Sequence, residues 1–577
     1  MLLLPSTKPI TTETISRKCS ALSPQHRFSS IRVELRSHNT KTVAVTATNK
    51  GTQPMLATTR RPLVLSLLTT FFNMLEDTIN SFSKAPLPPF IDPQCVLCDN
   101  FAPVDELPPT ECQVIEGQLP SCLNGAYIRN GPNPQYFPTG SYHQFDGDGM
   151  LHALTISGGR AMLCSRFVKT YKYNLEHESG QPVFPNMFAV FYRPTTFVIT
   201  SILFTAARIF SGQINPARGA GLANTSLAFF GDRLFALAES DLPYTVRVDK
   251  AGDIETIGRY DSNGELLQNM TAHPKIDLNT KQTFAFRYGM MRPFLTFFSF
   301  DANGSKQSDV PIFSVSHQSL VHDFAITERF AIFPEIQITV NPMAIMKGTP
   351  LMQLDHSKVP RIGVIPRNAK DESEMRWFDV PGFNIFHTIN AWEEEDDVVV
   401  LIAPNMLSIE HCLEKTELNH SSVEKVRIDL KRGIVSRFPL SARNLDFGVI
   451  NPALVGKKSQ YAYLGVGEPM PKMAGVVKLD LSGWEHQEHV VASRMYGQGC
   501  YGGEPFFVAK NPEDPNAEED DGYMVSYVHD EILGESKFLV MDAKSPTLEI
   551  VAVVKLPRRV PYGFHGLFVR QSDLNKL

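Results

Sequence analysis

Residues 523–554 read YMVSYVHDEILGESKFLVMDAKSPTLEIVAVV. Three runs in this stretch, 523–528, 537–541 and 548–554, are rich in valine, tyrosine and other β-forming residues, and polar segments with glycine, proline or aspartate separate them. This pattern predicts three antiparallel strands of one sheet. Similar runs recur at residues 233–239, 398–404 and 460–467. The chain is therefore predicted to be all-β.

Small sheets repeated over roughly 450 residues favour a β-propeller over a sandwich, because sandwiches are usually much shorter. None of the familiar propeller repeats is visible in the sequence, so periodicity leaves the number of blades open.

Composition bounds the function. The 577 residues are 43% hydrophobic and 20% charged, which is typical of a globular protein with a large core. The net charge of −6 and the absence of a dense basic block argue against a general nucleic-acid binder and favour neutral or apolar substrates. The eight cysteines are scattered, and the single CxxC, Cys95 to Cys98, lacks the partners of a zinc site.

Residues 1–50 differ from the rest of the chain. They hold eight Lys/Arg and fifteen Ser/Thr, and their only acids are Glu13 and Glu34. This composition is typical of an organelle transit peptide, which we interpret as a plastid import signal. A plain disordered tail is the alternative.

Two apolar segments have helical spacing. Fourteen uncharged residues lie between Arg61 and Glu76, with hydrophobic residues at steps of three and four that include Leu67 and Phe71. A second such stretch, with Phe197 and Phe204, lies before Arg208. These segments either dock on the domain or insert into a membrane surface. Neither reaches the ~20 residues that a membrane-spanning helix needs.

The sequence thus divides into three parts. Residues 1–50 are the expected transit peptide. Residues 51–110 are expected to form an amphipathic helix and a linker, because residues 84–110 contain seven prolines. Residues 111–577 are the expected propeller domain.

Four of the sixteen histidines lie among aromatic, proline and glycine residues with little charge: His273, His322, His387 and His565. None belongs to an HExxH motif. In a propeller, equivalent inner-strand positions of different blades converge on one axis, so residues 49, 65 and 178 positions apart can meet.

Six motifs follow in order along the chain: residues 127–134 (YIRNGPNP), 145–150 (FDGDGM), 238–244 (AESDLPY), 322–328 (HDFAITE), 501–505 (YGGEP) and 561–566 (PYGFHG). With this set, the sequence from about residue 111 to the C-terminus resembles the carotenoid cleavage oxygenase family. Within that family it is most similar to the type 4 subfamily of plant plastid carotenoid cleavage dioxygenases.

The resemblance implies a seven-bladed β-propeller with a helical dome over an Fe(II) site. It implies that His273, His322, His387 and His565 bind the iron and that Glu239, Glu468 and Glu504 are carboxylates that support these ligands. A ligating imidazole needs an acceptor for its other N–H, and carboxylates also offset the charge of the metal. Four other histidines are expected to be structural: His143, His152, His317 and His529.

The function implied is cleavage of a carotenoid or apocarotenoid double bond by O₂, at the 9,10 or 9′,10′ position, into two carbonyl products. Alternatives within the class are a 9-cis-epoxycarotenoid dioxygenase and a 7,8(7′,8′)-cleaving enzyme. A non-catalytic carotenoid-binding propeller is the alternative from another class. The expected location is the plastid, at a plastoglobule or thylakoid surface to which the apolar helices bind.

Overall fold

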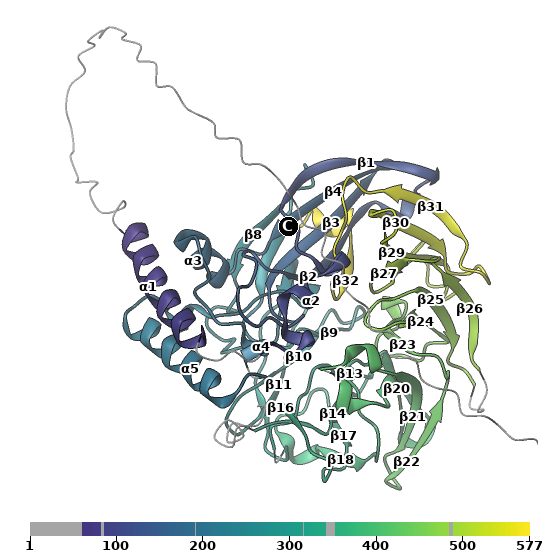
Figure 1. Cartoon of the computed structure of the whole chain (residues 1–577). Helices are drawn as coiled ribbons and strands as arrows, with labels where there is room; N and C mark the ends of the chain where they lie inside the picture. The colour runs from purple at the N-terminus through teal and green to yellow at the C-terminus, as the bar shows by residue number, and fades with distance from the viewer. Residues whose placement is uncertain are drawn as a thin grey trace, which may run out of the picture. The chain divides into compact units, whose positions relative to one another are not determined.

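A computed structural model describes residues 61–81, 86–190, 192–315, 317–341, 352–412, 414–483 and 488–577. The expected transit peptide, residues 1–50, lies outside the described residues. Residues 57–577 form one compact unit, and its described part is mostly β-structure, as predicted. The sheets are arranged like propeller blades around a common centre (Figure 1).

Five separate four-stranded antiparallel sheets are present in the described residues. They are β5–β8 (Ser226–Phe230, Arg233–Leu237, Tyr244–Val248, Ile254–Arg259), β9–β12 (Lys275–Ile276, Thr283–Tyr288, Leu295–Phe300, Val310–Ile312), β13, β14, β17 and β18 (Ala325–Ile326, Phe330–Glu335, Arg361–Pro366, Arg376–Asp379), β19–β22 (Asn390–Glu394, Val398–Met406, Ser421–Asp429, Ile434–Pro439) and β23–β26 (Leu445–Val449, Tyr461–Val466, Gly475–Asp480, Val490–Met495). A short pair, β15 and β16 (Ile338–Val340, Met352–Leu354), is inserted between β14 and β17.

The ten remaining strands form one continuous sheet. They are β1–β4 (Leu107–Gly117, Gly125–Asn133, Asp148–Ser157, Arg160–Phe167), β27–β31 (Cys500–Gly502, Phe506–Ala509, Gly522–Asp530, Glu535–Asp542, Ile550–Lys555) and β32 (Gly566–Arg570). The three strands predicted in residues 523–554 are β29, β30 and β31, which pair antiparallel in that order.

Strand β1 is the reason why the sheet is continuous. Its first part, from Leu107 to Cys112, pairs with β4, and its last part, from Gln113 to Gly117, pairs with β31. The expectation of seven blades is corrected here: the described strands form five separate four-stranded sheets, and one strand that pairs on both edges merges the others into a single sheet.

Each sheet is covered on both faces, as strand β20 shows. All nine of its residues are buried. Because side chains along a strand point alternately to opposite faces, Val399 and Leu401 enter the cluster shared with the sheet of β14. Val400 and Ile402 enter the cluster shared with the sheet of β24. A continuous apolar run in the sequence therefore corresponds to a strand between two neighbouring sheets.

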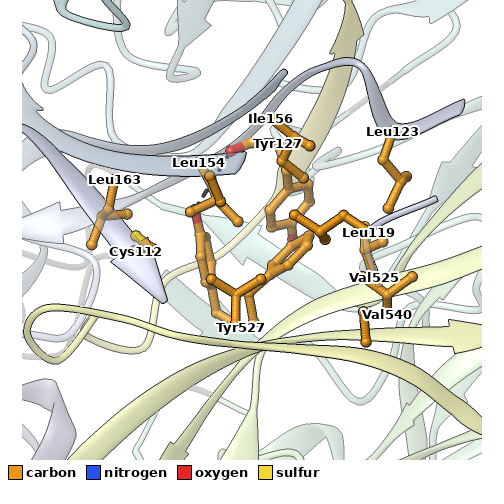
Figure 2. Close-up of a cluster of buried hydrophobic side chains, with 14 of the residues drawn as sticks. Cys112, Leu119, Leu123, Tyr127, Leu154, Ile156, Leu163, Val525, Tyr527 and Val540 are labelled. Atoms are coloured by element: carbon orange, nitrogen blue, oxygen red, sulfur yellow. Dashed lines mark hydrogen bonds between the residues drawn. The ribbon is translucent and has the colours of Figure 1, made fainter. Parts of the chain in front are cut away.

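The two halves of the ten-stranded sheet also enclose a core between them (Figure 2). Tyr127 on β2 and Tyr527 on β29 lie with ring centroids 5.2 Å apart, and both are buried. The Tyr527 hydroxyl donates to the backbone carbonyl of His152 on β3 at 3.2 Å. The C-terminal strand β32 pairs with β2, so the chain closes the ring of sheets by joining its last strand to one of its first.

The longer helices lie outside the sheets. They are α1 (Arg61–Ser81), α3 (Tyr171–Ser179) and α5 (Thr195–Phe210), and the short ones are α2 (Pro93–Val96), α4 (Met187–Val190) and α6 (Gln571–Leu574). The predicted helices after Arg61 and before Arg208 are thus α1 and α5. Among the described helices, none is both long and apolar enough to cross a membrane.

The proline-rich stretch before β1 is packed against the domain rather than free. Ile91 and Asn100 are buried in it, and the Asn100 side chain donates to the carbonyl of Val560 at 2.9 Å. The sheet begins at Leu107, shortly before the expected start at residue 111. The described cysteines are all free.

Candidate metal centre

The four singled-out histidines occupy equivalent places in the fold. Each lies one to three residues before a strand that forms the end of its sheet: His273 before β9, His322 before β13, His387 before β19 and His565 before β32. In each of these four sheets, the histidine therefore lies just before an edge strand. The arrangement of the sheets brings the four histidines together.

The imidazoles converge on one point. One nitrogen of each of the four rings lies within 4.8 Å of those of the other three. Nε2 of His273 lies 3.0 Å from Nε2 of His322. Ring centroids are 4.5 Å apart for His273 and His565 and 5.1 Å apart for His387 and His565. The structure thus brings together all four histidines that the sequence indicated.

Carboxylates hold the outer nitrogen of three of these rings. Nδ1 of His322 contacts Glu239, and Nδ1 of His565 lies 2.9 Å from Glu504. Nδ1 of His387 lies 3.1 Å from Asp446. His273, in the part of the chain described, forms no such ion pair. In each of these three rings, Nδ1–H is bonded to a carboxylate, so Nε2 keeps a free lone pair that can be directed at the centre of the cluster.

Glu239 and Glu504 are therefore placed as the sequence indicated, but Glu468 is not. Its side chain is 48% exposed and pairs with Arg443 at 3.3 Å. Asp446 takes the place expected for Glu468, because β23 bulges between Asp446 and Val449 and so turns the aspartate toward His387. Sequence reasoning missed Asp446, since one aspartate inside a short strand carries no local signal of such a bulge.

Phe447 shows the local cost of this arrangement. It has φ = 52°, an unusual conformation for a bulky residue. Its N–H donates to Oδ1 of Asp446 at 2.7 Å, and its ring lies 5.6 Å from the rings of both His387 and His565. Strained backbone of this kind is concentrated at functional sites, where the surrounding structure enforces it.

Two of the glycine-rich motifs place His565. The Asn130 N–H donates to the His565 carbonyl at 3.0 Å, and the Phe564 N–H donates to the Asn130 carbonyl at 2.9 Å. A side chain at Gly131 could not be accommodated, because its Cβ would lie 2.7 Å from Cα of Gly563. The motifs at 127–134 and 561–566 are thus two segments whose backbones must approach each other closely.

The electrostatic surroundings of His273 and His387 differ. Burial, together with the neighbouring imidazoles, lowers the pKa of His273 well below its usual range. Burial also opposes protonation of His387, but the Asp446 carboxylate outweighs it and raises the pKa of that ring. The site therefore combines four imidazole nitrogen donors with carboxylates that lie behind three of them.

The donor set fits a metal ion. Metal–imidazole bonds are about 2.0–2.1 Å long, so two ligands at right angles lie about 3 Å apart. The 3.0 Å separation between Nε2 of His273 and Nε2 of His322 has this value. Imidazole nitrogens suit zinc, copper, iron and nickel, so the donor type leaves the identity of the metal open.

The other histidines expected to be structural have ordinary partners where the structure shows them. Nδ1 of His529 lies 2.9 Å from Oγ of Ser536, and Nδ1 of His152 lies 2.8 Å from Oγ of Ser165. Nδ1 of His143 accepts from the Phe145 N–H at 3.1 Å. None of the three belongs to the four-histidine cluster.

Comparison with known proteins identifies a family. The model of the family described as retinal pigment epithelial membrane protein matches residues 101–570. A probable carotenoid cleavage dioxygenase 4, chloroplastic, of Arabidopsis thaliana is 63% identical over 518 residues, which are 89% of this chain and 87% of that protein. A chloroplastic 9-cis-epoxycarotenoid dioxygenase of Oryza sativa subsp. japonica is 58% identical over 519 residues, 88% of this chain and 81% of that protein.

A third relative is a chromoplastic zeaxanthin 7,8(7′,8′)-cleavage dioxygenase of Crocus sativus, 56% identical over 365 residues, 63% of this chain and 99% of that protein. Solved structures show the same fold. A lignostilbene dioxygenase of Pseudomonas brassicacearum superposes with a TM-score of 0.72 at 23% identity, over 84% of this chain and 100% of that one. A variant of a Synechocystis apocarotenoid oxygenase superposes with a TM-score of 0.68 at 25% identity, with the same coverage.

Proposed function

Since this chain belongs to the retinal pigment epithelial membrane protein family and is a carotenoid cleavage dioxygenase, we propose that it binds Fe(II). We further propose that it cleaves the 9,10 or 9′,10′ double bond of a carotenoid or apocarotenoid. The observation that carries the proposal is the convergence of His273, His322, His387 and His565, with carboxylates behind three of them. Both oxygen atoms of O₂ enter the products, one in each carbonyl group.

The residues of the chain have two tasks in this reaction. The four imidazoles would hold the iron, and Glu239, Asp446 and Glu504 would fix the orientation of three of them. Iron bound there supplies the activation of O₂. A polyene has no acidic or nucleophilic group, so no general acid–base pair is required of the protein.

The second task is to present one double bond among many similar ones. Aromatic side chains are available for this on several sides of the histidines. Phe447 lies against His387 and His565, and Phe386 lies 6.0 Å from His322, centroid to centroid. These rings can stack on a flat polyene and exclude water from it.

We also propose that helices cover the site. A chain of aromatic contacts supports this proposal: Phe188 on α4 lies 5.4 Å from Phe145, and Phe145 lies 5.6 Å from Phe564, the residue before His565. The helical dome expected from the sequence would then include α4 and the neighbouring helix α5.

Membrane association is a further part of the proposal. Helices α1 and α5 pack together through an Arg208 to Asn73 hydrogen bond of 2.7 Å and through the rings of Phe72 and Phe204. Outside this contact, large apolar side chains remain exposed: Leu67, Phe71 and Met74 on α1 and Ile199, Ile202, Leu203 and Phe210 on α5. Such a surface suits the apolar side of a membrane interface, where a carotenoid would be taken up.

The exposed set differs from the one that the sequence suggested. Phe197 and Phe204 are only half-exposed, since Phe197 lies beneath the guanidinium of Arg193 at 4.0 Å and Phe204 faces Phe72. Ile202 and Leu203 take their place as the exposed residues of α5.

A plastid location fits the composition of residues 1–50 and the chloroplastic relatives. We propose that residues 1–50 are a transit peptide and that the mature enzyme acts at a plastoglobule or thylakoid surface. The relatives named for 9-cis-epoxycarotenoid and for 7,8(7′,8′) cleavage support two alternatives for the substrate and bond.

Product analysis tests the proposal. The iron-loaded enzyme is incubated with β-carotene, with a β-apocarotenal and with a 9-cis-epoxycarotenoid, and the products are identified by mass spectrometry. We expect an ionone from the first two substrates. Turnover of the epoxycarotenoid alone would support the first alternative, and a fragment shorter than ionone would support 7,8 cleavage. Absence of any product from all three would contradict the proposed function.

A further inference from the structure

A buried ion pair lies directly behind the histidines and is not explained by metal binding itself. Asp323 is 2% exposed, and its Oδ1 lies 2.7 Å from Nζ of Lys275. Its Oδ2 accepts from the backbone N–H of Thr388 at 2.7 Å and lies 2.9 Å from the Thr388 hydroxyl. In the described part of the chain, none of these three side chains forms a hydrogen bond or ion pair with an imidazole.

The three members come from three different ligand segments. Asp323 follows His322 directly, Thr388 follows His387 directly, and Lys275 lies two residues after His273. These segments begin the edge strands of three separate sheets, β9, β13 and β19. One carboxylate therefore links three of the four ligand segments, through the Lys275 side chain and through the backbone and hydroxyl of Thr388.

The fourth segment is held differently. His565 is placed by the backbone hydrogen bonds between Asn130 and Phe564 and by Glu504, which also accepts from the Gly566 N–H at 2.8 Å. Asp323 thus serves three of the four ligand segments, and each of the three begins a different sheet.

The charges of the cluster cancel. Lys275 and Asp323 form a neutral pair, so the pair adds no net charge to the metal centre, unlike Glu239, Asp446 and Glu504. The pairing also satisfies the aspartate, because a buried carboxylate requires charge and hydrogen-bond partners. The two carboxylate oxygens of Asp323 therefore fix the positions of Lys275 and Thr388 relative to Asp323.

We propose that Asp323, Lys275 and Thr388 form a brace that sets the spacing of His273, His322 and His387 before the metal binds. They are positioning residues, not ligands. The proposal rests on the metal site of the proposed function, and it adds that the unloaded site is already arranged for its metal by contacts outside the imidazoles.

The test measures metal affinity rather than turnover. Protein stripped of metal with a chelator is titrated with Co(II), whose visible absorption reports the coordination geometry, in competition with a chromophoric chelator. Asp323→Asn leaves an uncompensated lysine beside a neutral amide. We expect it to bind Co(II) about 10- to 100-fold more weakly than the unmodified protein, with an altered absorption spectrum.

A matched control is available in the same domain. Lys358 pairs with the buried Glu335 at 2.9 Å, with exposures close to those of Lys275 and Asp323, and Glu335 keeps Arg361 as a second partner. Lys358→Met should therefore leave Co(II) affinity within about twofold of the unmodified protein. The double variant Asp323→Asn/Lys275→Gln replaces the ion pair by a neutral amide hydrogen bond and should recover part of the lost affinity.

Circular dichroism establishes whether each variant folds. If Asp323→Asn does not fold, Lys275→Gln and Thr388→Val carry the test, and each should weaken Co(II) binding. A folded brace variant that binds Co(II) with unchanged affinity and spectrum would overturn the brace. If the unmodified protein does not bind Co(II), or binds it equally well after replacement of His322, the metal site of the proposed function is wrong. This result differs from the one that would overturn the brace alone.

Discussion

The Asp446 carboxylate accepts a hydrogen bond from Nδ1 of His387 at 3.1 Å, and this pair brings together a strand of one sheet and the edge of another. The contact lowers the pKa of Asp446, because the charge and hydrogen bond of His387 outweigh the burial that opposes ionisation. An aspartate on β23 therefore supports the third imidazole.

The first prediction concerns the ligands. Replacing His273, His322, His387 or His565 singly with alanine removes one of four nitrogen donors, and we expect bound iron and cleavage activity to fall below detection in each variant. Iron is measured by plasma mass spectrometry and folding by circular dichroism. The control is His529→Ala, which should retain iron, since His529 lies outside the cluster. Retention of iron by a His322 variant together with its loss from the control would reverse the assignment of the two histidines.

The second prediction separates the two carboxylates. Asp446→Asn keeps an acceptor oxygen for His387 but loses the charge, so we expect kcat/KM to fall about 10- to 100-fold. Glu468→Gln changes a half-exposed residue that contacts Arg443, and its activity should stay within about twofold of the unmodified enzyme. Steady-state kinetics on one apocarotenal measure both. Greater damage from Glu468→Gln than from Asp446→Asn would contradict our placement of the support for His387.

The third prediction concerns lipid binding. Aspartate at Leu67, Phe71, Ile202 and Leu203 removes exposed apolar surface worth roughly 1.5–3 kcal/mol for each side chain that becomes fully buried. We expect the quadruple variant to be released from liposomes in flotation assays and to cleave membrane-embedded substrate more slowly. Its activity on a detergent-dispersed apocarotenal should persist.

The β29–β30 hairpin provides the control for this experiment. Ile532 and Leu533 are as exposed as the residues of α1 and α5 but lie in the turn between β29 and β30, outside these helices. Aspartate at these two positions should leave flotation unchanged. Continued flotation of the quadruple variant, or equal loss of activity on both substrates, would show that the helices do not bind the membrane.

The fourth prediction concerns pH and stability. Burial lowers the pKa of Lys425 from 10.5 to about 8, where its ammonium donates to the carbonyls of Leu481 and Gly483. Because the unfolded chain binds this proton more tightly, the lysine destabilises the fold fully below pH 8, and the destabilisation disappears as the pH rises to about 10.5. Its size is at most about 3 kcal/mol.

Urea unfolding of the unmodified protein and of Lys425→Met at several pH values checks this sign. Relative to the variant, the unmodified protein should gain stability as the pH increases from 8 to 10. A difference that stays constant, or that changes in the opposite direction, would show that folding does not lower the pKa of Lys425.

Local sequence information was sufficient for the strands and helices that the sequence analysis singled out. Residues 523–554 predicted three strands that the structure contains in the expected order, because β-formers interrupted by turn residues encode a meander without help from distant residues. The spacing of Leu67 and Phe71 likewise predicted α1. The sheet count was not accessible in this way, since only the double pairing of β1 decides that ten strands form one sheet.

The sequence by itself indicated which four histidines meet, because their uncharged surroundings and the ordered motifs are properties of the chain. The resemblance of its motifs to the family indicated Glu239 and Glu504 as well. Tertiary structure alone decided between Glu468 and Asp446, because the choice depends on a bulge in β23 that directs one carboxylate to His387 and leaves the other beside Arg443. It also decided that Asp323 joins three ligand segments, since contacts between residues 48 and 65 positions apart, Lys275 to Asp323 and Asp323 to Thr388, form only when separate sheets meet.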